Sequence, residues 1–304
     1  MKCRRCKNKA VVDLKNHHTA FCEPCFLEFV ERQVRRAIHE HDMMEKGERV
    51  LVCVSGGKDS LALWDLLSRL GYEAHGLHVD LGIDGYSTDS RIKVEQFAAQ
   101  RGLPLKIVSL VDLQIPIPLV ARRSRRPECS VCGIIKRHFF NKLAVEEGYR
   151  VVATGHNLDD EAGRLLGNLL HWQWEYLLKQ RPVLEAVGDV LARKVEPLCR
   201  LTERETAAYA ILRKIDYVIQ ECPMSRGATS LRYKEVLNIL EDCMPGTKAI
   251  FYGGFLKEGQ NLLKLCKQKQ DKQASLAAAD LTRCSLCGSA SFMDPCNFCK
   301  LTSG

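Results

Sequence analysis

The residues that decide the fold run from position 49 to position 70 and read RVLVCVSGGKDSLALWDLLSRL. Residues 49–54 form an apolar run with the length and composition of a buried strand. Residues 61–70 are rich in apolar side chains and end before Gly71, as a helix does. The six residues between them contain two glycines and form the turn. This stretch therefore predicts a strand, a tight turn and a helix, the opening unit of an α/β domain.

The same alternation of strand and helix continues along the chain. It predicts a doubly wound parallel sheet of the Rossmann-like kind. The later strands are expected over residues 73–79, 105–110, 150–154 and 190–195. The later helices are expected over residues 88–101, 133–147, 158–170, 202–214, 229–241 and 247–270.

The turn, Ser55-Gly56-Gly57-Lys58-Asp59-Ser60, has the chemistry of a phosphate-binding loop. Glycine lets the backbone approach phosphate oxygens without a clashing Cβ, and the free N–H groups at a helix start attract anions. Lys58 adds a positive charge, and Ser55 and Ser60 add hydroxyl donors. The spacing is neither that of the Walker loop nor that of the dinucleotide fingerprint. An ordinary glycine turn is the alternative, and the position between a strand and a helix argues against it.

The composition is that of a globular protein. The chain has 304 residues, 46% of them hydrophobic, with 45 Lys and Arg against 37 Asp and Glu. These values exclude collagen-like, mucin-like and disordered chains. No apolar run reaches the length of about 18 residues that a membrane span needs, and the start lacks a secretory signal, so we expect a cytoplasmic protein. The net charge of +8 is compatible with a nucleic-acid partner without establishing one.

Fifteen cysteines without a secretory signal indicate thiols that hold metal rather than disulfides. Two Cys-x-x-Cys pairs open the chain and two close it, and each double pair offers four thiolates to a tetrahedral zinc ion. His17 and His18 lie between the first two pairs, but four sulfurs already complete a closed site. Chance spacing or labile disulfides are the alternative. The expected zinc ligands are Cys3, Cys6, Cys22 and Cys25 at one end, and Cys284, Cys287, Cys296 and Cys299 at the other.

A third group of cysteines has a different setting. Cys129 and Cys132 lie in a basic stretch, and Cys222 follows far along the chain, before Pro223. Thiols beside basic residues indicate a reactive or metal-binding site. The basic side chains suit contact with RNA phosphates, and a solvated charged loop is the alternative. They belong to Arg122, Arg123, Arg125, Arg126, Lys136 and Arg137.

An aromatic segment, His171-Trp172-Gln173-Trp174, follows the helix expected over residues 158–170. We favour its packing in the core or in an interface over stacking on an RNA base.

These motifs together resemble those of a known family. The loop from Ser55 to Ser60 resembles the PP-loop of N-type ATP pyrophosphatases, which split ATP into AMP and pyrophosphate. The tRNA 2-thiouridine synthetases of the TtuA type are similar in the remaining motifs and in the flanking double Cys-x-x-Cys modules. Those motifs are Cys129-Ser-Val-Cys132-Gly133, Thr154-Gly-His-Asn-Leu-Asp-Asp-Glu-Ala162 and Cys222-Pro223.

The resemblance implies that Cys129, Cys132 and Cys222 hold a 4Fe–4S cluster, and that Lys136 and Asp160 serve catalysis. It also implies ATP with Mg²⁺, tRNA as substrate, a ubiquitin-like sulfur carrier protein or free sulfide as sulfur donor, and a homodimer. In this interpretation AMP is transferred to a uridine carbonyl, and sulfur then replaces the oxygen. The residues that the resemblance places at ATP are Ser55, Gly56, Gly57, Lys58, Asp59, Ser60, His78, Gly155 and Asp160.

The expected organisation is an N-terminal zinc module, a linking helix, a catalytic domain and a C-terminal zinc module.

Two other functions stay open: a PP-loop enzyme that transfers nitrogen, and a non-catalytic RNA-binding protein with zinc modules. For the three cysteines, persulfide and disulfide chemistry is the alternative to a cluster. The chain departs from the usual family pattern at 171–174 and after Pro223, which leaves open whether a T-loop or a wobble uridine is modified. The expected boundaries are 1–26, 27–46, 47–272 and 273–304.

Overall fold

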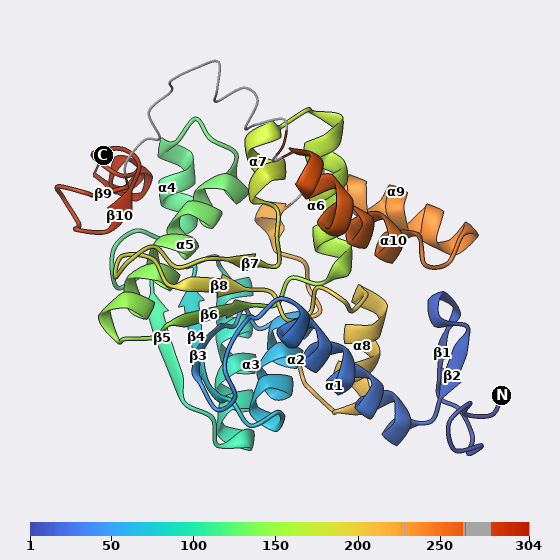
Figure 1. Ribbon diagram of the computed structural model, residues 1–304. Coiled ribbons are helices and arrows are strands. Elements are labelled where there is room, and N and C mark those ends of the chain that lie inside the picture. Colours follow the sequence, from blue (N-terminus) through green and yellow to red (C-terminus); the bar gives the residue numbers. More distant parts are fainter. Residues whose placement is uncertain (226, 228, 264, 266–280, 304) are drawn as a thin grey trace.

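The computed structural model describes residues 1–225, 227, 229–263, 265 and 281–303, and a six-stranded sheet lies at its centre (Figure 1). The strand order is β5-β4-β3-β6-β8-β7, and every neighbouring pair is parallel except β8 and β7. The predicted doubly wound parallel sheet is confirmed, with an antiparallel edge strand that the sequence did not indicate. The strands are β3 (Arg49–Cys53), β4 (Glu73–Asp80), β5 (Leu105–Ser109), β6 (Val151–Thr154), β7 (Val183–Leu184) and β8 (Arg193–Val195).

Strand β3 shows why both faces of the sheet are covered by helices. Val50 and Val52 point into the main core with the buried side chains of α2, whereas Leu51 and Cys53 point into a second cluster with Ala144 of α5. A strand that is buried on both faces reads as a continuous apolar run. The helices of this region are α2 (Lys58–Arg69), α3 (Tyr86–Arg101), α4 (Ile117–Arg123), α5 (Glu128–Glu146), α6 (Leu158–Leu170) and α7 (Trp174–Lys179).

Helix α5 begins earlier than the sequence indicated. The expected helix started at residue 133, but α5 starts at Glu128, directly after Pro127. Proline disfavours a helical conformation in the residue before it and suits a helix start. The helix therefore begins before both cysteines. Cys129 and Cys132 therefore stand on the first turns of the helix, three residues apart and on one face.

Helix α1 (Glu23–Glu40) differs from the expected linker in position and in role. It starts at the second Cys-x-x-Cys pair, with Cys22 as N-cap and Pro24 in the first turn, and it ends six residues before position 46. Phe26, Val30 and Val34 are fully buried in the main core. The helix is thus part of the framework that holds the sheet.

The N-terminal module contains a small hairpin, and the C-terminal half of the chain adds further helices. Thr202 and Glu205 form the predicted capping box at the start of α8, with backbone-to-side-chain hydrogen bonds of 3.2 and 2.7 Å. In the part of the chain that the structure describes, no helix is long and apolar enough to span a membrane. The elements of the N-terminal hairpin and of the C-terminal half are β1 (Val12–Leu14), η1 (Lys15–His17), β2 (Thr19–Phe21), α8 (Glu203–Leu212), η2 (Pro223–Ser225), α9 (Thr229–Cys243), α10 (Thr247–Gly254), η3 (Phe255–Gly259), β9 (Thr282–Arg283), β10 (Ala290–Ser291) and α12 (Asn297–Thr302).

The helix expected over 247–270 is α10 followed by the π-helical turn η3. Most of its last part, with Cys266, lies outside the described residues, as do the expected small-residue linker over 274–279 and the boundary at 272–273.

Candidate functional site

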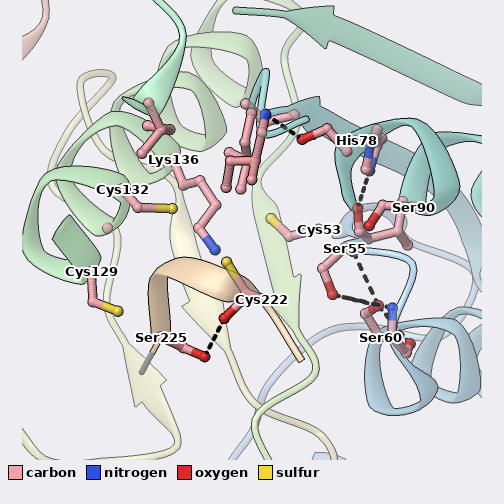
Figure 2. A pocket seen from close by; sticks show the side chains of 18 of the residues that line it. Cys53, Ser55, Ser60, His78, Ser90, Cys129, Cys132, Lys136, Cys222 and Ser225 are labelled. Carbon is pink, nitrogen blue, oxygen red and sulfur yellow. Dashed lines mark hydrogen bonds between the residues drawn. The ribbon is translucent and has the colours of Figure 1, made fainter. Parts of the chain in front are cut away.

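A cavity of about 430 Å³ lies beyond the carboxyl ends of β3, β4 and β6 (Figure 2). In open parallel sheets, ligands bind at this edge, at the point where the strand order reverses. Here β3 is that point, because the chain runs outward through β4 and β5 and then returns to β6 on the other side. One wall carries the glycine loop, and another carries three cysteines.

The glycine loop is held by its own hydrogen bonds. The Ser55 N–H donates to Oγ of Ser60 at 3.1 Å, and that hydroxyl donates to the Gly57 carbonyl at 3.0 Å. Gly56 has φ +86, and a Cβ there would lie 2.9 Å from the Ser90 carbonyl oxygen. Only glycine fits such a conformation so close to another backbone. The loop therefore reaches the start of α2 in a fixed shape, with helix N–H groups free for an anion.

Gly155 brings a second backbone up to the same loop. A Cβ at this position would lie 2.9 Å from Cα and from the backbone N of Ser60. The end of β6 can approach the start of α2 only without a side chain here. The next residue, His156, also lines the cavity, and burial lowers its pKa to about 4. Reasoning from the sequence quoted this histidine within a motif but gave it no role.

His78 offers the cavity an unpartnered polar atom. Its side chain is 3% exposed, and Nδ1 lies 2.8 Å from the Val54 carbonyl oxygen, while Nε2 has no hydrogen-bond partner. Burial lowers the pKa of this imidazole. Because a neutral ring bonded to a carbonyl carries its proton on Nδ1, Nε2 is an acceptor. It therefore suits a hydroxyl or amino donor on a nucleoside better than a phosphate oxygen.

Lys58 is engaged away from the cavity. Its Nζ lies 3.0 Å from Oδ2 of Asp59 and 2.7 Å from Oε1 of Glu203, and it does not line the cavity. Asp59 does line the cavity, and it accepts hydrogen bonds from Asn157 at 3.1 Å and from the Thr206 hydroxyl. Burial raises the pKa of Asp59, and the ammonium of Lys58 opposes that shift. Contact of Lys58 with a phosphate requires these ion pairs to be exchanged.

Asp160 is not brought to the cavity wall. It stands in the first turn of α6, where Oδ2 accepts the Asn157 N–H at 3.0 Å and closes a capping box. Its other oxygen lies 2.6 Å from Nζ of Lys234, which also contacts Glu203 at 3.2 Å. No local sequence pattern indicates this role of Lys234, because α9 meets α6 only through the tertiary fold.

The three cysteines of the second wall come from two segments. Cys129 and Cys132 project from the start of α5, and Cys222 lies just before η2, so that all three line the cavity together with Lys136 (Figure 2). The Ser225 hydroxyl donates to the Cys222 carbonyl at 2.7 Å and shapes that turn. Burial raises the pKa of Cys132, and the positive charge of Lys136 opposes this shift.

The spacing of sulfurs separates these cysteines from the two terminal groups. At each end of the chain, four sulfurs lie within 4.8 Å of one another, as a single tetrahedral ion requires. Among the described residues, the three cavity cysteines do not form such a close group. Three thiols that do not lie this close together are suited to a metal group larger than a single ion. His17 bonds Glu205 at 2.9 Å, and neither it nor His18 belongs to a close metal-ligand group.

The aromatic segment is not packed in the core, and packing in an interface stays a prediction. Trp172 is 66% exposed and Trp174 is 50% exposed, and their ring centroids lie 5.4 Å apart. Trp172 has φ +51 in a turn that ends α6, which directs the indole outward. Of the basic side chains near the cysteines, Arg126 donates to Asn297 of the C-terminal module at 3.2 Å, and Arg137 is exposed.

Comparison with known proteins places this site in a family. Residues 27–227 match the PP-loop domain, and residues 2–27 match the N-terminal LIM domain of the 2-thiouridine synthetase TtuA. The tRNA-5-methyluridine(54) 2-sulfurtransferase of Thermus thermophilus is 47% identical over 303 residues, which cover 99% of this chain and 91% of that protein. The chain belongs to the TtuA-type 2-thiouridine synthetases. The resemblance seen in the motifs is thereby confirmed, together with the enzyme class that it implied.

Two further proteins are similar to this chain. The protein of the same name from Pyrococcus horikoshii is 42% identical over 300 residues, which cover 99% of this chain and 93% of that one. The structure of the U34-tRNA thiolase NcsA from Methanococcus maripaludis contains a [4Fe-4S] cluster. It superimposes with a TM-score of 0.80 at 26% identity and covers 100% of this chain and 96% of that one.

Proposed function

We propose that this TtuA-type synthetase is an ATP-dependent tRNA sulfurtransferase that replaces the 2-oxygen of uridine 54 with sulfur. The observation that carries the proposal is one cavity with two unlike walls, a glycine loop for phosphates and three cysteines with a lysine. Nucleotide activation and sulfur transfer thus share a space of about 430 Å³. An enzyme that transfers nitrogen has no use for the cysteine wall, and an RNA-binding protein has no use for either.

The choice of uridine 54 rests on relatedness. The proteins named for position 54 are 47%, 42% and 38% identical to this chain. The thiolase named for position 34 is 26% identical, and the yeast protein named cytoplasmic tRNA 2-thiolation protein 1 is 29% identical. The greater similarity supports the T-loop uridine over the wobble uridine.

The glycine loop is suited to bind the pyrophosphate part of ATP. N–H groups at the start of α2 would donate to the phosphate oxygens, with the hydroxyls of Ser55 and Ser60 beside them. Nε2 of His78 would accept a hydrogen bond from the nucleoside. Mg²⁺, when bound, neutralises phosphate charge, and the Asp59 carboxylate on the cavity wall is suited to hold it. Asp160 would act through its capping box and Lys234, orienting Asn157 against Asp59.

The first chemical step makes the uridine oxygen a leaving group. The 2-oxygen attacks the α-phosphorus of ATP, the bond to pyrophosphate breaks, and the oxygen carries AMP. In the second step a sulfur nucleophile attacks C2, and AMP departs with the original oxygen. Lys136 would stabilise the negative charge that develops in both steps, because it lines the cavity together with the cysteines.

Cys129, Cys132 and Cys222 are the residues that would hold a 4Fe–4S cluster. When bound, such a cluster supplies an iron without a protein ligand that can hold hydrosulfide. These three sulfurs do not form a group within 4.8 Å of one another, as the terminal cysteines do, and this supports the assignment over a single ion. We further propose two structural zinc ions in the terminal modules, delivery of sulfur by a ubiquitin-like carrier or as free sulfide, and a homodimer.

The decisive experiment is thiolation of a tRNA in vitro with anaerobically purified and reconstituted protein, ATP and sulfide. Nucleoside mass spectrometry with position mapping should find one sulfur at uridine 54, with AMP and pyrophosphate formed in equal amounts. Cys222→Ser should abolish the sulfur product, whereas Cys243→Ser, which changes an exposed thiol of α9, should leave it intact. Sulfur at position 34, an amino product or no AMP would overturn the proposal.

A further inference from the structure

The C-terminal module docks on the helix that carries two of the cavity cysteines. Phe298 lies between Cys296 and Cys299, and its ring stacks on the imidazole of His138 in α5 with centroids 3.6 Å apart and an interplanar angle of 1°. The same ring meets Phe139 edge-on at 5.7 Å and 83°. Burial lowers the pKa of His138 to about 4, so this imidazole is uncharged at neutral pH and stacks as a plain aromatic ring.

The docking contact is continuous with the cysteine wall. Phe298 and Leu301 pack against the apolar cluster of Val131, Ile135 and Phe139, and Cys132 and Met224 pack against the same cluster. Met224 lies two residues after Cys222, and its carbonyl accepts a hydrogen bond from Sγ of Cys129 at 3.4 Å. One apolar cluster therefore touches both segments that supply cysteines to the cavity.

The start of α5 is exposed at its tip, although α4 packs along the helix. Its N-cap is Pro127, which has no side-chain capping hydrogen bond, and the neighbouring residues Arg125, Arg126 and Glu128 are exposed. Arg126 donates to Asn297 of the module at 3.2 Å, directly beside Phe298. The C-terminal module thus contacts the chain just before α5, at Arg126, and the helix itself at His138, about two turns beyond Cys132.

We propose that Phe298 is a positioning residue, through which the C-terminal four-cysteine module sets the placement of Cys129 and Cys132 relative to Cys222. This proposal rests on the proposed function in so far as the three cysteines hold a cluster. The buried residues of the module are its own cysteines, so its shape depends on the metal that those four thiols bind. A metal group held by three thiols is sensitive to their spacing, since each ligand bond tolerates only small displacements.

The first test measures cluster retention. After anaerobic reconstitution, Phe298→Ala should lose iron to a chelator on the order of five to ten times faster than the wild type, followed by the cluster absorbance. Zinc content and the melting temperature should stay close to the wild-type values. The matched control is Phe292→Ala, because Phe292 belongs to the same module but is 63% exposed. Phe298→Tyr, which keeps the stacking ring, should restore the wild-type rate.

A second test is independent of iron. Amide hydrogen exchange of the first turns of α5, measured without iron, should be on the order of tenfold faster in Phe298→Ala and also in His138→Ala. The second variant removes the stack from the α5 side and leaves the module untouched. Wild-type exchange in both variants would overturn the positioning role. If the wild type binds no iron, the cluster assignment fails, while the exchange result still decides the role of Phe298.

Discussion

The two ends of the chain carry the same four-sulfur arrangement in opposite structural settings. At the N-terminus, Cys3 and Cys22 belong to the main hydrophobic core, together with Phe21, Phe26 and Phe29. At the C-terminus, the buried sulfurs form a small cluster of their own, which reaches the rest of the protein through Phe298 and Leu301. One module is built into the framework, and the other is docked beside the cavity.

The difference teaches that a shared metal motif does not imply a shared task. The N-terminal module continues directly into α1, whose buried face packs under the sheet. Its loss should be felt by the whole fold. The C-terminal module packs mainly against α5, with a further contact from Phe292 to Lys179 of α7, so its loss should act on the cysteine wall. Variants at the two ends therefore separate effects on global stability from effects on the cysteine wall of the cavity.

The largest effect is expected from removing one ligand at each end. Cys22→Ser should destabilise the whole protein by several kcal/mol, because it removes one ligand of the proposed zinc site at the edge of the main core. Cys296→Ser should leave the main melting transition nearly unchanged and reduce iron content after reconstitution. Thermal unfolding and metal analysis of the two variants test this pair. Equal losses of stability in the two variants would contradict the different roles assigned to the two modules.

A smaller effect is expected from the aromatic contacts of the N-terminal module. Phe29 is 4% exposed and stacks on Phe21 at 5.2 Å, so Phe29→Ala should cost about 3 kcal/mol of unfolding free energy. Iron bound per folded chain should not change. Urea denaturation gives the free energy, and Phe292→Ala serves as the exposed control. A loss of iron at unchanged stability would contradict the assigned roles.

Two polar contacts join the N-terminal hairpin to Glu205 of α8, a long one of 3.5 Å from Nδ2 of Asn16 and a shorter one from His17. Nε2 of His17 lies 2.9 Å from Oε1 of Glu205, whose carboxylate is buried in the capping box. His17→Ala should cost ~1 kcal/mol, since a buried acceptor loses one partner. Chemical denaturation measures it, and His18→Asn is the control, because His18 is exposed and asparagine tolerates its φ of +47.

The smallest effect concerns pH. The Arg5 hydrogen bond lowers the pKa of the Glu28 carboxyl at the base of the N-terminal module. The folded pKa is therefore below the unfolded one, so this contribution is present at neutral pH and is lost as the pH falls through the folded pKa. Glu28→Gln should lower the melting temperature slightly at pH 7, and the difference should vanish in acid. A difference in melting temperature that increases in acid would contradict the prediction.

Local features of the chain were predictable from its sequence. The strand before Ser55, the loop and the helix after it are contiguous, and their apolar pattern and glycines are sufficient to indicate them. The two groups of four cysteines are likewise visible as spacing, and the Thr202 capping box as a local pattern. Each of these depends on residues that are neighbours in sequence.

Features that depend on distant residues were not predictable. Two contacts join elements far apart in the chain: the ion pair of Lys234 with Asp160, and the stack of Phe298 on His138. The free Nε2 of His78 likewise depends on the tertiary fold. The absence of the tryptophans from the core was not predictable for a different reason. Hydrophobicity favours burial, but the turn at Trp172 directs the side chain away from the core. The roles of the cavity residues in catalysis remain predictions for the experiments above.

The origin of the third cysteine has a consequence for biosynthesis. Cys222 is more than 160 residues beyond the phosphate loop and follows β8 and α8 in the chain. A nascent chain released from the ribosome up to α8 has every strand of the central sheet and both cysteines of α5, but not the last thiol. The nucleotide wall is therefore complete in the growing polypeptide before the cysteine wall is. Loading of the proposed cluster on these three thiols therefore has to follow as a late maturation event.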